Sequence, residues 1–152
     1  WSITGIPVNC IDSETLTENS LPTSNQYING EKDGLWITYW DEGTPRYVDY
    51  MKDGKRHGPF TWYWENGNIS GTGNYIEGKE NGIYTQYNRD GSLRSEETYT
   101  DGKYDGVSKY YSNYGKVFIE KVFKENKQIS IQCFDKNGNK VEPCDLKYRH
   151  RD

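Results

Sequence analysis

Short stretches of apolar and polar residues, each closed by a turn residue, succeed one another along most of the chain. The stretch Leu35-Trp36-Ile37-Thr38-Tyr39-Trp40 is typical, being rich in the aromatic and β-branched residues that favour strands. Glycines close these stretches at alternating intervals of 13 and 11 residues, with one last interval of 12, and Asn126 takes the place of one glycine. The predicted turn glycines are Gly30, Gly43, Gly54, Gly67, Gly78, Gly91, Gly102, Gly115 and Gly138.

The chemistry of the turns predicts β-hairpins. Pairs such as Asn29-Gly30, Asp53-Gly54 and Asp101-Gly102 supply the positive φ values that tight hairpin turns require. The chain has no alanine, and glycine interrupts every potential helix within about a dozen residues. We therefore expect an all-β fold.

Two turns and two strands make one unit, and the fixed period of about 24 residues indicates a repeat array. A lone hairpin is marginally stable, so the units must stack on their neighbours in a single domain of tandem antiparallel hairpins. The ends lack the repeat. The expected organisation is an N-terminal extension or cap (1–26), five hairpin repeats (27–49, 50–74, 75–98, 99–122 and 123–142) and a C-terminal tail (143–152).

Strand alternation divides the aromatic residues between two faces of the sheet. One face repeats a tyrosine in four units and is predicted to form the shared core; its residues are Tyr39, Tyr63, Tyr87 and Tyr111. The other face carries an excess of tryptophan near the N-terminus. Our hypothesis is that Trp40, Trp62 and Trp64 form an exposed aromatic patch that binds a protein or a glycan. The alternative is that they cover a second core or the N-terminal cap.

Composition narrows the function. The 152 residues carry a net charge of −4 with both signs interspersed, so there is no basic stripe for nucleic acid and we expect no nucleic-acid partner. No stretch approaches the roughly 18 apolar residues of a membrane span. Only His57 and His150 are histidines, and the acidic residues recur at turn positions. We therefore expect no catalytic residues, no metal site and no cofactor.

The cysteines leave two alternatives open. Cys133 and Cys144 flank the last predicted turn and could form a disulfide, with Cys10 left as an odd thiol, or all three could be free. The chain begins with Trp1 instead of methionine, so we expect that a segment has been removed before it, either a secretion signal or merely a stretch trimmed at an arbitrary boundary. On this basis an extracytoplasmic or cell-envelope location is favoured over a cytoplasmic one.

The repeat resembles a known family. Its clearest copy is Tyr75-Ile-Glu-Gly78-Lys79-Glu-Asn-Gly82-Ile-Tyr84-Thr-Gln-Tyr87-Asn-Arg-Asp-Gly91-Ser-Leu93, and Lys55-Arg56-His57-Gly58 adds a second segment. These motifs resemble the bacterial variant of the MORN repeat, over about residues 27–142. The fifth copy departs from the pattern at Asn126 and Ser130.

The resemblance implies an elongated twisted sheet or solenoid that acts as a protein-interaction scaffold or adaptor. Some MORN-like proteins associate with membranes or phosphoinositides, and bacterial relatives of this variant are described as antitoxin components of toxin–antitoxin systems. The expected partner is another protein, with membrane association only indirect. The alternative function is a carbohydrate- or cell-wall-binding module, because choline- and glucan-binding repeats are also tandem aromatic hairpins with glycine turns.

Overall fold

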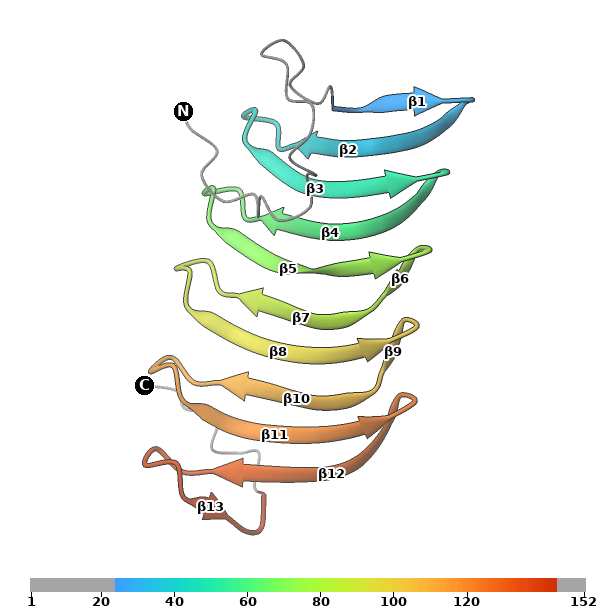
Figure 1. Cartoon of the computed structure of the whole chain (residues 1–152). Coiled ribbons are helices and arrows are strands. Elements are labelled where there is room, and N and C mark those ends of the chain that lie inside the picture. The colour runs from blue at the N-terminus through green and yellow to red at the C-terminus, as the bar shows by residue number, and fades with distance from the viewer. Residues whose placement is uncertain (1–23, 145–152) are drawn as a thin grey trace, which may run out of the picture.

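The computed structural model describes residues 24–144, which form one open antiparallel sheet without a helix (Figure 1). Figure 1 shows the strands stacked side by side in chain order as a single curved layer. The all-β prediction is thus confirmed. Within the described residues the 13 strands are β1 (Gln26–Ile28), β2 (Glu31–Tyr39), β3 (Pro45–Lys52), β4 (Lys55–Tyr63), β5 (Ile69–Ile76), β6 (Lys79–Glu80), β7 (Gly82–Tyr87), β8 (Leu93–Thr100), β9 (Lys103–Tyr104), β10 (Gly106–Tyr111), β11 (Val117–Lys124), β12 (Lys127–Phe134) and β13 (Lys140–Val141).

Two-residue turns join the strands along one edge of the sheet, which we call the first-turn edge. In each of them both central residues have positive φ, as in Asp53 (47°) and Gly54 (74°). Positive φ at both central positions matches the right-handed twist of the two flanking strands. The fifth turn reaches the same geometry without glycine, because Asn126 adopts a φ of 68°.

The turns of the first-turn edge also connect neighbouring hairpins. The Gly54 amide donates to the Lys32 carbonyl at 3.0 Å, and the Gly78 amide donates to the Arg56 carbonyl at 2.7 Å. The Gly102 and Asn126 amides donate in the same way to carbonyls at the equivalent position of the preceding hairpin. Each turn is therefore tied to the hairpin before it, and the sheet is continuous across repeats.

The opposite edge, the second-turn edge, carries the wider loops and a recurrent β-bulge. The register shifts at Tyr39, Tyr63, Tyr87 and Tyr111, once in each of four successive hairpins. A bulge places two residues of one strand opposite one of its partner and bends the strand. The recurrent tyrosine thus marks a bend at which each hairpin approaches its loop.

Buried side chains gather on one face of the sheet, which we call the aromatic face. Cross-strand register places Phe60, Trp62 and Tyr84 on this face, opposite Gly73, Gly71 and Glu97 respectively. Ring contacts continue from Tyr47 through to Phe123 with centroids 4.5 to 6.4 Å apart. The buried residues named by side-chain exposure are Asp49, Phe60, Tyr75, Ser95, Glu97, Ser108, Ile119 and Cys133.

The prediction that the recurrent tyrosines form the core is wrong. Tyr39 is 51% exposed, and none of the four tyrosines is among the buried residues. Each of the four lies at a β-bulge, and their regular recurrence reflects this bulge. The packed face is instead the one on which the residues differ between repeats. On this face large rings pack against small residues of neighbouring strands, so each position depends on its own neighbours.

Gly73 shows how closely this face is packed. A Cβ atom at Gly73 would lie 2.6 Å from the Cε1 and Cζ atoms of the Phe60 ring, and one at Gly71 would lie 2.8 Å from Tyr84 Cε2. Both rings lie across the backbone of β5. Glycine is therefore required at these strand positions because a ring occupies the space of a side chain.

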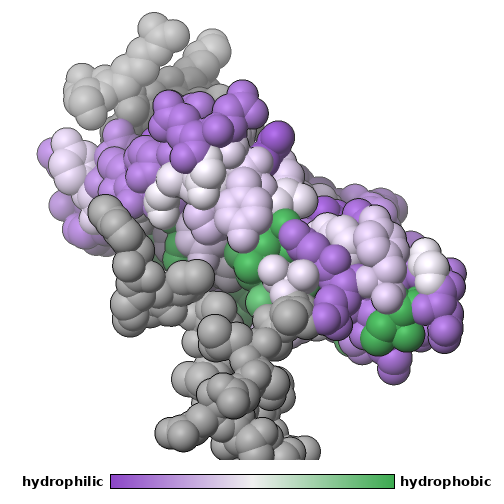
Figure 2. Space-filling model, turned by 90° about the horizontal axis from the view of Figure 1, so that it is seen from above, coloured by the Kyte–Doolittle hydropathy of each residue, from purple (hydrophilic) through white to green (hydrophobic). Residues whose placement is uncertain are grey.

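The outer surface is largely polar. Figure 2, seen from the β1 end, shows a mostly hydrophilic surface with hydrophobic residues in small, separate areas. Exposed apolar side chains such as Ile83 (59% exposed) and Val107 (40% exposed) stand singly on the face opposite the aromatic face.

Substituting Gly73→Ala is expected to lower the free energy of unfolding by about 1–3 kcal/mol, because the added methyl group overpacks the Phe60 ring. Urea denaturation would measure the loss. In the double variant Gly73→Ala/Phe60→Leu the second change should cost less than it does alone, since the shorter side chain makes room for the methyl group. Strictly additive losses would contradict this packing.

Candidate functional site

The three tryptophans predicted to form one patch lie in two places. Trp40 and Trp64 are half-buried at the second-turn edge, and each indole Nε1 donates to a carbonyl of the next hairpin, Tyr63 at 3.3 Å and Tyr87 at 3.1 Å. Arginine side chains lie over both indoles, Arg46 on the first and Arg89 on the second. These two tryptophans therefore link neighbouring hairpins.

Trp62 lies on the aromatic face, away from that edge. Its ring packs against Phe60, with centroids 4.6 Å apart, and against Tyr47 and Tyr84. Its Nε1 donates to Asp49 Oδ1 at 3.3 Å. Trp62 thus belongs to the packed face, half-buried, and is not brought together with Trp40 and Trp64 in one patch.

Two buried carboxylates lie on the aromatic face. The Asp49 side chain is 7% exposed and pairs with Arg56, whose Nε lies 3.3 Å from Oδ1. The Arg56 guanidinium also lies over the rings of Trp62 (5.8 Å) and Tyr75 (5.4 Å). The charge of Asp49 is therefore neutralised by a cation that is itself held against aromatic rings.

The second carboxylate, Glu97, is 5% exposed and is held by neutral donors. Oε2 accepts hydrogen bonds from Tyr104 Oη at 3.1 Å, Gln86 Nε2 at 3.2 Å and Tyr99 Oη at 3.3 Å. Between residues 24 and 144 no lysine, arginine or histidine nitrogen forms an ion pair with it. A buried carboxylate without a cation is costly unless hydrogen bonds satisfy it, and here three donors do so.

The negative charge of Glu97 affects the pKa values of the tyrosines around it. Burial, and then the Glu97 charge, raise the pKa of Tyr110 to about 12. Burial raises the pKa of Tyr99 further still, assisted by its hydrogen bond with Tyr104 and by Glu97. The pKa of Tyr84 is raised by burial first and by Glu97 second. The Glu97 carboxylate therefore adds to burial in opposing the ionisation of these tyrosines.

A hollow of about 420 Å³ opens beside Glu97, across β7, β8, β10 and β11. It lies where the aromatic residues of earlier repeats give way to smaller ones, since Gln86 stands one repeat after Trp62. Ser108 likewise follows Tyr84, and its fully buried Oγ has no hydrogen-bond partner. The lining residues are Gln86, Arg94, Ser95, Glu97, Tyr110, Tyr111, Ser112, Asn113, Phe118, Ile119 and Lys121.

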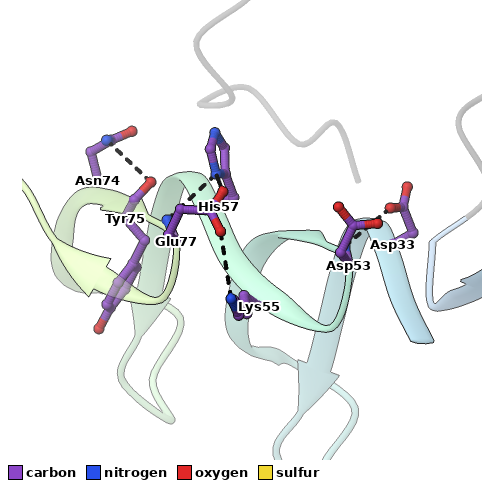
Figure 3. A network of polar contacts seen from close by, with 7 residues as sticks. All are labelled: Asp33, Asp53, Lys55, His57, Asn74, Tyr75 and Glu77. Carbon is purple, nitrogen blue, oxygen red and sulfur yellow. Dashed lines mark hydrogen bonds and ion pairs between the residues drawn. The ribbon is translucent and has the colours of Figure 1, made fainter.

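A polar network lies along the first-turn edge (Figure 3), and none of its residues lines the hollow. Glu77 lies between His57, whose Nδ1 is 3.1 Å from Oε1, and Lys55, whose Nζ is 3.6 Å from Oε2. On the neighbouring turn the Asp53 amide approaches Asp33 Oδ2 at 3.5 Å. The His57, Lys55 and Glu77 side chains are between 37% and 61% exposed, so these contacts are screened by water and contribute little to stability.

The remaining predicted residues are structural. The nine turn glycines all have positive φ. Cys133 on β12 and Cys144 form a disulfide, with Cα atoms 5.3 Å apart. Cys10 and His150 lie outside the described residues, as do most of the N-terminal extension and the end of the tail.

The buried carboxylates are not among the residues predicted from the sequence. Most acidic residues recur at turns, whereas Asp49 and Glu97 lie within strands, two repeats apart. Gly73 holds the equivalent position between them and Lys121 the one after them, so no acidic periodicity is visible. A signal was present, because alternation places Glu97 on the same face as Tyr99. A strand-interior acidic residue on an aromatic face is expected to have a partner.

Two other kinds of site are absent from the described part of the chain. Residues 24–144 contain no group of three or more His, Cys, Asp or Glu side chains placed to hold a metal ion. In the same range no helix is long and apolar enough to cross a membrane.

Comparison with known families identifies the repeat. Residues 56–77 and 80–101 each match the model of the MORN repeat variant. These matches support a MORN-like repeat protein. The matched segments begin one repeat apart and correspond to the hairpins β4–β5 and β7–β8. No curated protein matches the chain significantly. MORN repeats are generally associated with binding to proteins or membranes.

The raised tyrosine pKa values predict a loss of stability in alkali. Tyr110 has its pKa raised from 10.0 to about 12, so its protonated form stabilises the fold fully below pH 10, and that contribution is lost as the pH rises from 10 to 12. Urea midpoints measured from pH 8 to 12 should fall in this window. The fall should be shallower in Tyr110→Phe, which has no hydroxyl to ionise, and an equal slope would contradict the assignment.

Ser108→Ala is expected to leave stability unchanged or to raise it by up to about 1 kcal/mol. The serine Oγ is buried without a partner, so its removal relieves an unsatisfied polar group while leaving no large cavity. Thermal unfolding would measure the change. A clear loss of stability would show that the hydroxyl has a partner in solution.

Proposed function

We propose that this MORN-like chain is a non-catalytic scaffold that binds another protein through the hollow beside Glu97 on its aromatic face. The observation that carries the proposal is that hollow, of about 420 Å³, on a face that is otherwise tightly packed. Polar groups with restricted positions line it, including Gln86 and Ser95, the second of which is 2% exposed. Concave sites with a few placed polar groups are where proteins bind ligands or partner side chains.

The chemistry around Glu97 supports binding over catalysis. Its carboxylate accepts from Tyr99, Tyr104 and Gln86, so it is fixed by neutral donors. His57, the histidine among the described residues, lies at the first-turn edge in contact with Glu77. Among the described residues, the lining of the hollow contains no histidine, cysteine or second carboxylate beside Glu97, and Glu97 forms no ion pair with the lining cations Arg94 and Lys121.

Two finer possibilities follow from the repeat family and the aromatic residues. An antitoxin-type role is one form of the protein-binding proposal, in which the partner is a toxin. Glycan binding is the alternative, but the indoles of Trp40 and Trp64 are engaged by neighbouring carbonyls and by arginines, which leaves less ring surface for a sugar. The protein-binding form is therefore favoured.

A co-purification experiment with the full chain tests the proposal. The variant Gln86→Trp fills the hollow with the residue found one repeat earlier at Trp62, and it is expected to lose at least about 90% of the captured partner, because a blocked hot-spot pocket commonly costs more than a factor of ten in affinity. The matched control is Ile83→Trp, which adds the same indole on the opposite face of the same strand. This control should retain the partner.

Two results would contradict the proposal. Equal capture by wild type and Gln86→Trp, with both proteins folded by circular dichroism, would move the binding surface away from the hollow. A reproducible hit on a glycan array that Trp62→Ala abolishes, without any captured protein, would favour the carbohydrate alternative.

A further inference from the structure

The two buried carboxylates of the aromatic face occupy equivalent repeat positions. Asp49 and Glu97 stand two repeats apart in the sequence. The cation of Asp49 is Arg56, and the residue two repeats after Arg56 is Tyr104. Each carboxylate thus contacts the residue at the same relative position, but the first contact is an ion pair and the second is a hydroxyl hydrogen bond.

Because Tyr104 stands where the earlier repeat has Arg56, Glu97 is surrounded by rings and hydrogen bonds but has no paired cation within the described part of the chain. The first site combines a carboxylate, a guanidinium and two aromatic rings, with Arg56 over Trp62 and Tyr75. The second site keeps the carboxylate and has more tyrosines around it, of which Tyr99 and Tyr104 donate to Oε2. A cation bound beside Glu97 would give the second site the same combination of carboxylate, cation and rings as the first site.

Glu97 is among the residues that line the hollow, whereas its partner Tyr104 is not. Gln86, Ser95 and Tyr110 lie around this opening together with Glu97 itself. In the preceding repeat the indole of Trp62 occupies the position that Gln86 holds here. The hollow therefore lies where the preceding repeat has a large side chain, and the buried Glu97 is among its lining residues.

Two cations also line the hollow, and they have to be weighed against this view. Arg94 is exposed, and the Lys121 ammonium lies 5.4 Å from the centroid of the Tyr110 ring. Neither forms an ion pair with Glu97. Glu97 is a further cause, after burial, of the raised pKa of Tyr84 and Tyr110, and Arg94 opposes it at Tyr84.

We propose that the hollow binds a cationic side chain of the partner protein, a lysine or an arginine, against Glu97 and the surrounding tyrosine rings. The inference rests on the proposed protein-binding function and names the chemistry that this site recognises. The Asp49–Arg56 pair is the internal form of the same interaction. The partner then supplies from outside the paired cation that Glu97 does not have among the described residues.

Direct titration with a small cation tests this chemistry without the partner. The probe is N-acetyl-arginine methylamide, added to the full chain and followed by NMR shifts of the tyrosine and Gln86 side-chain signals. Binding in the millimolar range is expected, and Glu97→Gln should weaken it at least about tenfold by removing the charge from the hydrogen bond. The matched control Glu120→Gln removes one charge from the opposite face of β11 and should bind as the wild type does.

Two further variants make the result decisive. Tyr104→Arg restores the cation of the Asp49 site and should abolish binding of the probe, because the internal guanidinium then pairs with Glu97. Arg94→Ala should strengthen binding, since it removes a repelling charge from the rim. Thermal unfolding of each variant would verify that it is folded.

The outcomes separate this inference from the broader function. Loss of probe binding in Glu97→Gln and Tyr104→Arg, with retention in Glu120→Gln, supports a cation site. Binding of the anionic probe N-acetyl-glutamate methylamide that Arg94→Ala abolishes would overturn it in favour of an acidic side chain. No probe binding, together with partner capture that Gln86→Trp blocks but Glu97→Gln does not, would reject the cation while leaving the scaffold proposal intact.

Discussion

The structure depends on a backbone constraint at the first-turn edge, where two consecutive residues must adopt positive φ. This geometry joins two strands in two residues and fixes their register. The amides of four of these turns then donate to carbonyls of the preceding hairpin, so that the constraint also sets the spacing between repeats. Asn126 satisfies it without glycine, because asparagine tolerates the left-handed region. Register and stacking therefore follow from a local conformational requirement.

Once the register is set, the packing of the aromatic face depends on the volumes of the side chains that meet across the strands. Rings of Phe60 and Tyr84 lie across the backbone of β5, and glycine at positions 71 and 73 makes room for them. This matching of large to small side chains is incomplete in the following strands, because Gln86 stands one repeat after Trp62 and Ser108 one repeat after Tyr84. The hollow is the space that these smaller side chains leave unfilled. A repeat array can thus acquire a binding site by losing bulk in one unit, without any change of fold.

The buried carboxylates turn this hollow into a specific site. Asp49 is neutralised within the chain by Arg56, whereas Glu97 is held by tyrosine hydroxyls and an amide. Hydrogen bonds from neutral groups keep a carboxylate in place but leave its charge available to a ligand. The two sites differ at one equivalent repeat position, which is Arg56 in the first and Tyr104 in the second. This single difference, and not the fold that the repeats share, determines whether the carboxylate has a paired cation.

The alternating glycines determined the hairpins, the period and the antiparallel order, because tight turns with positive φ are encoded by neighbouring residues. Alternation in the sequence placed Phe60 and Trp62 on one face, but it could not say which face is packed or that a bulge separates Trp64 from Trp62. Tyr39 recurs regularly because of a bulge that exists only once strands are paired, and it is half exposed. The burial of Glu97 likewise depends on Tyr99, Tyr104 and Gln86 converging from different strands. Local conformation is written in adjacent residues, whereas burial and the hollow depend on volumes and charges that meet only across strands, and only the tertiary structure decided them.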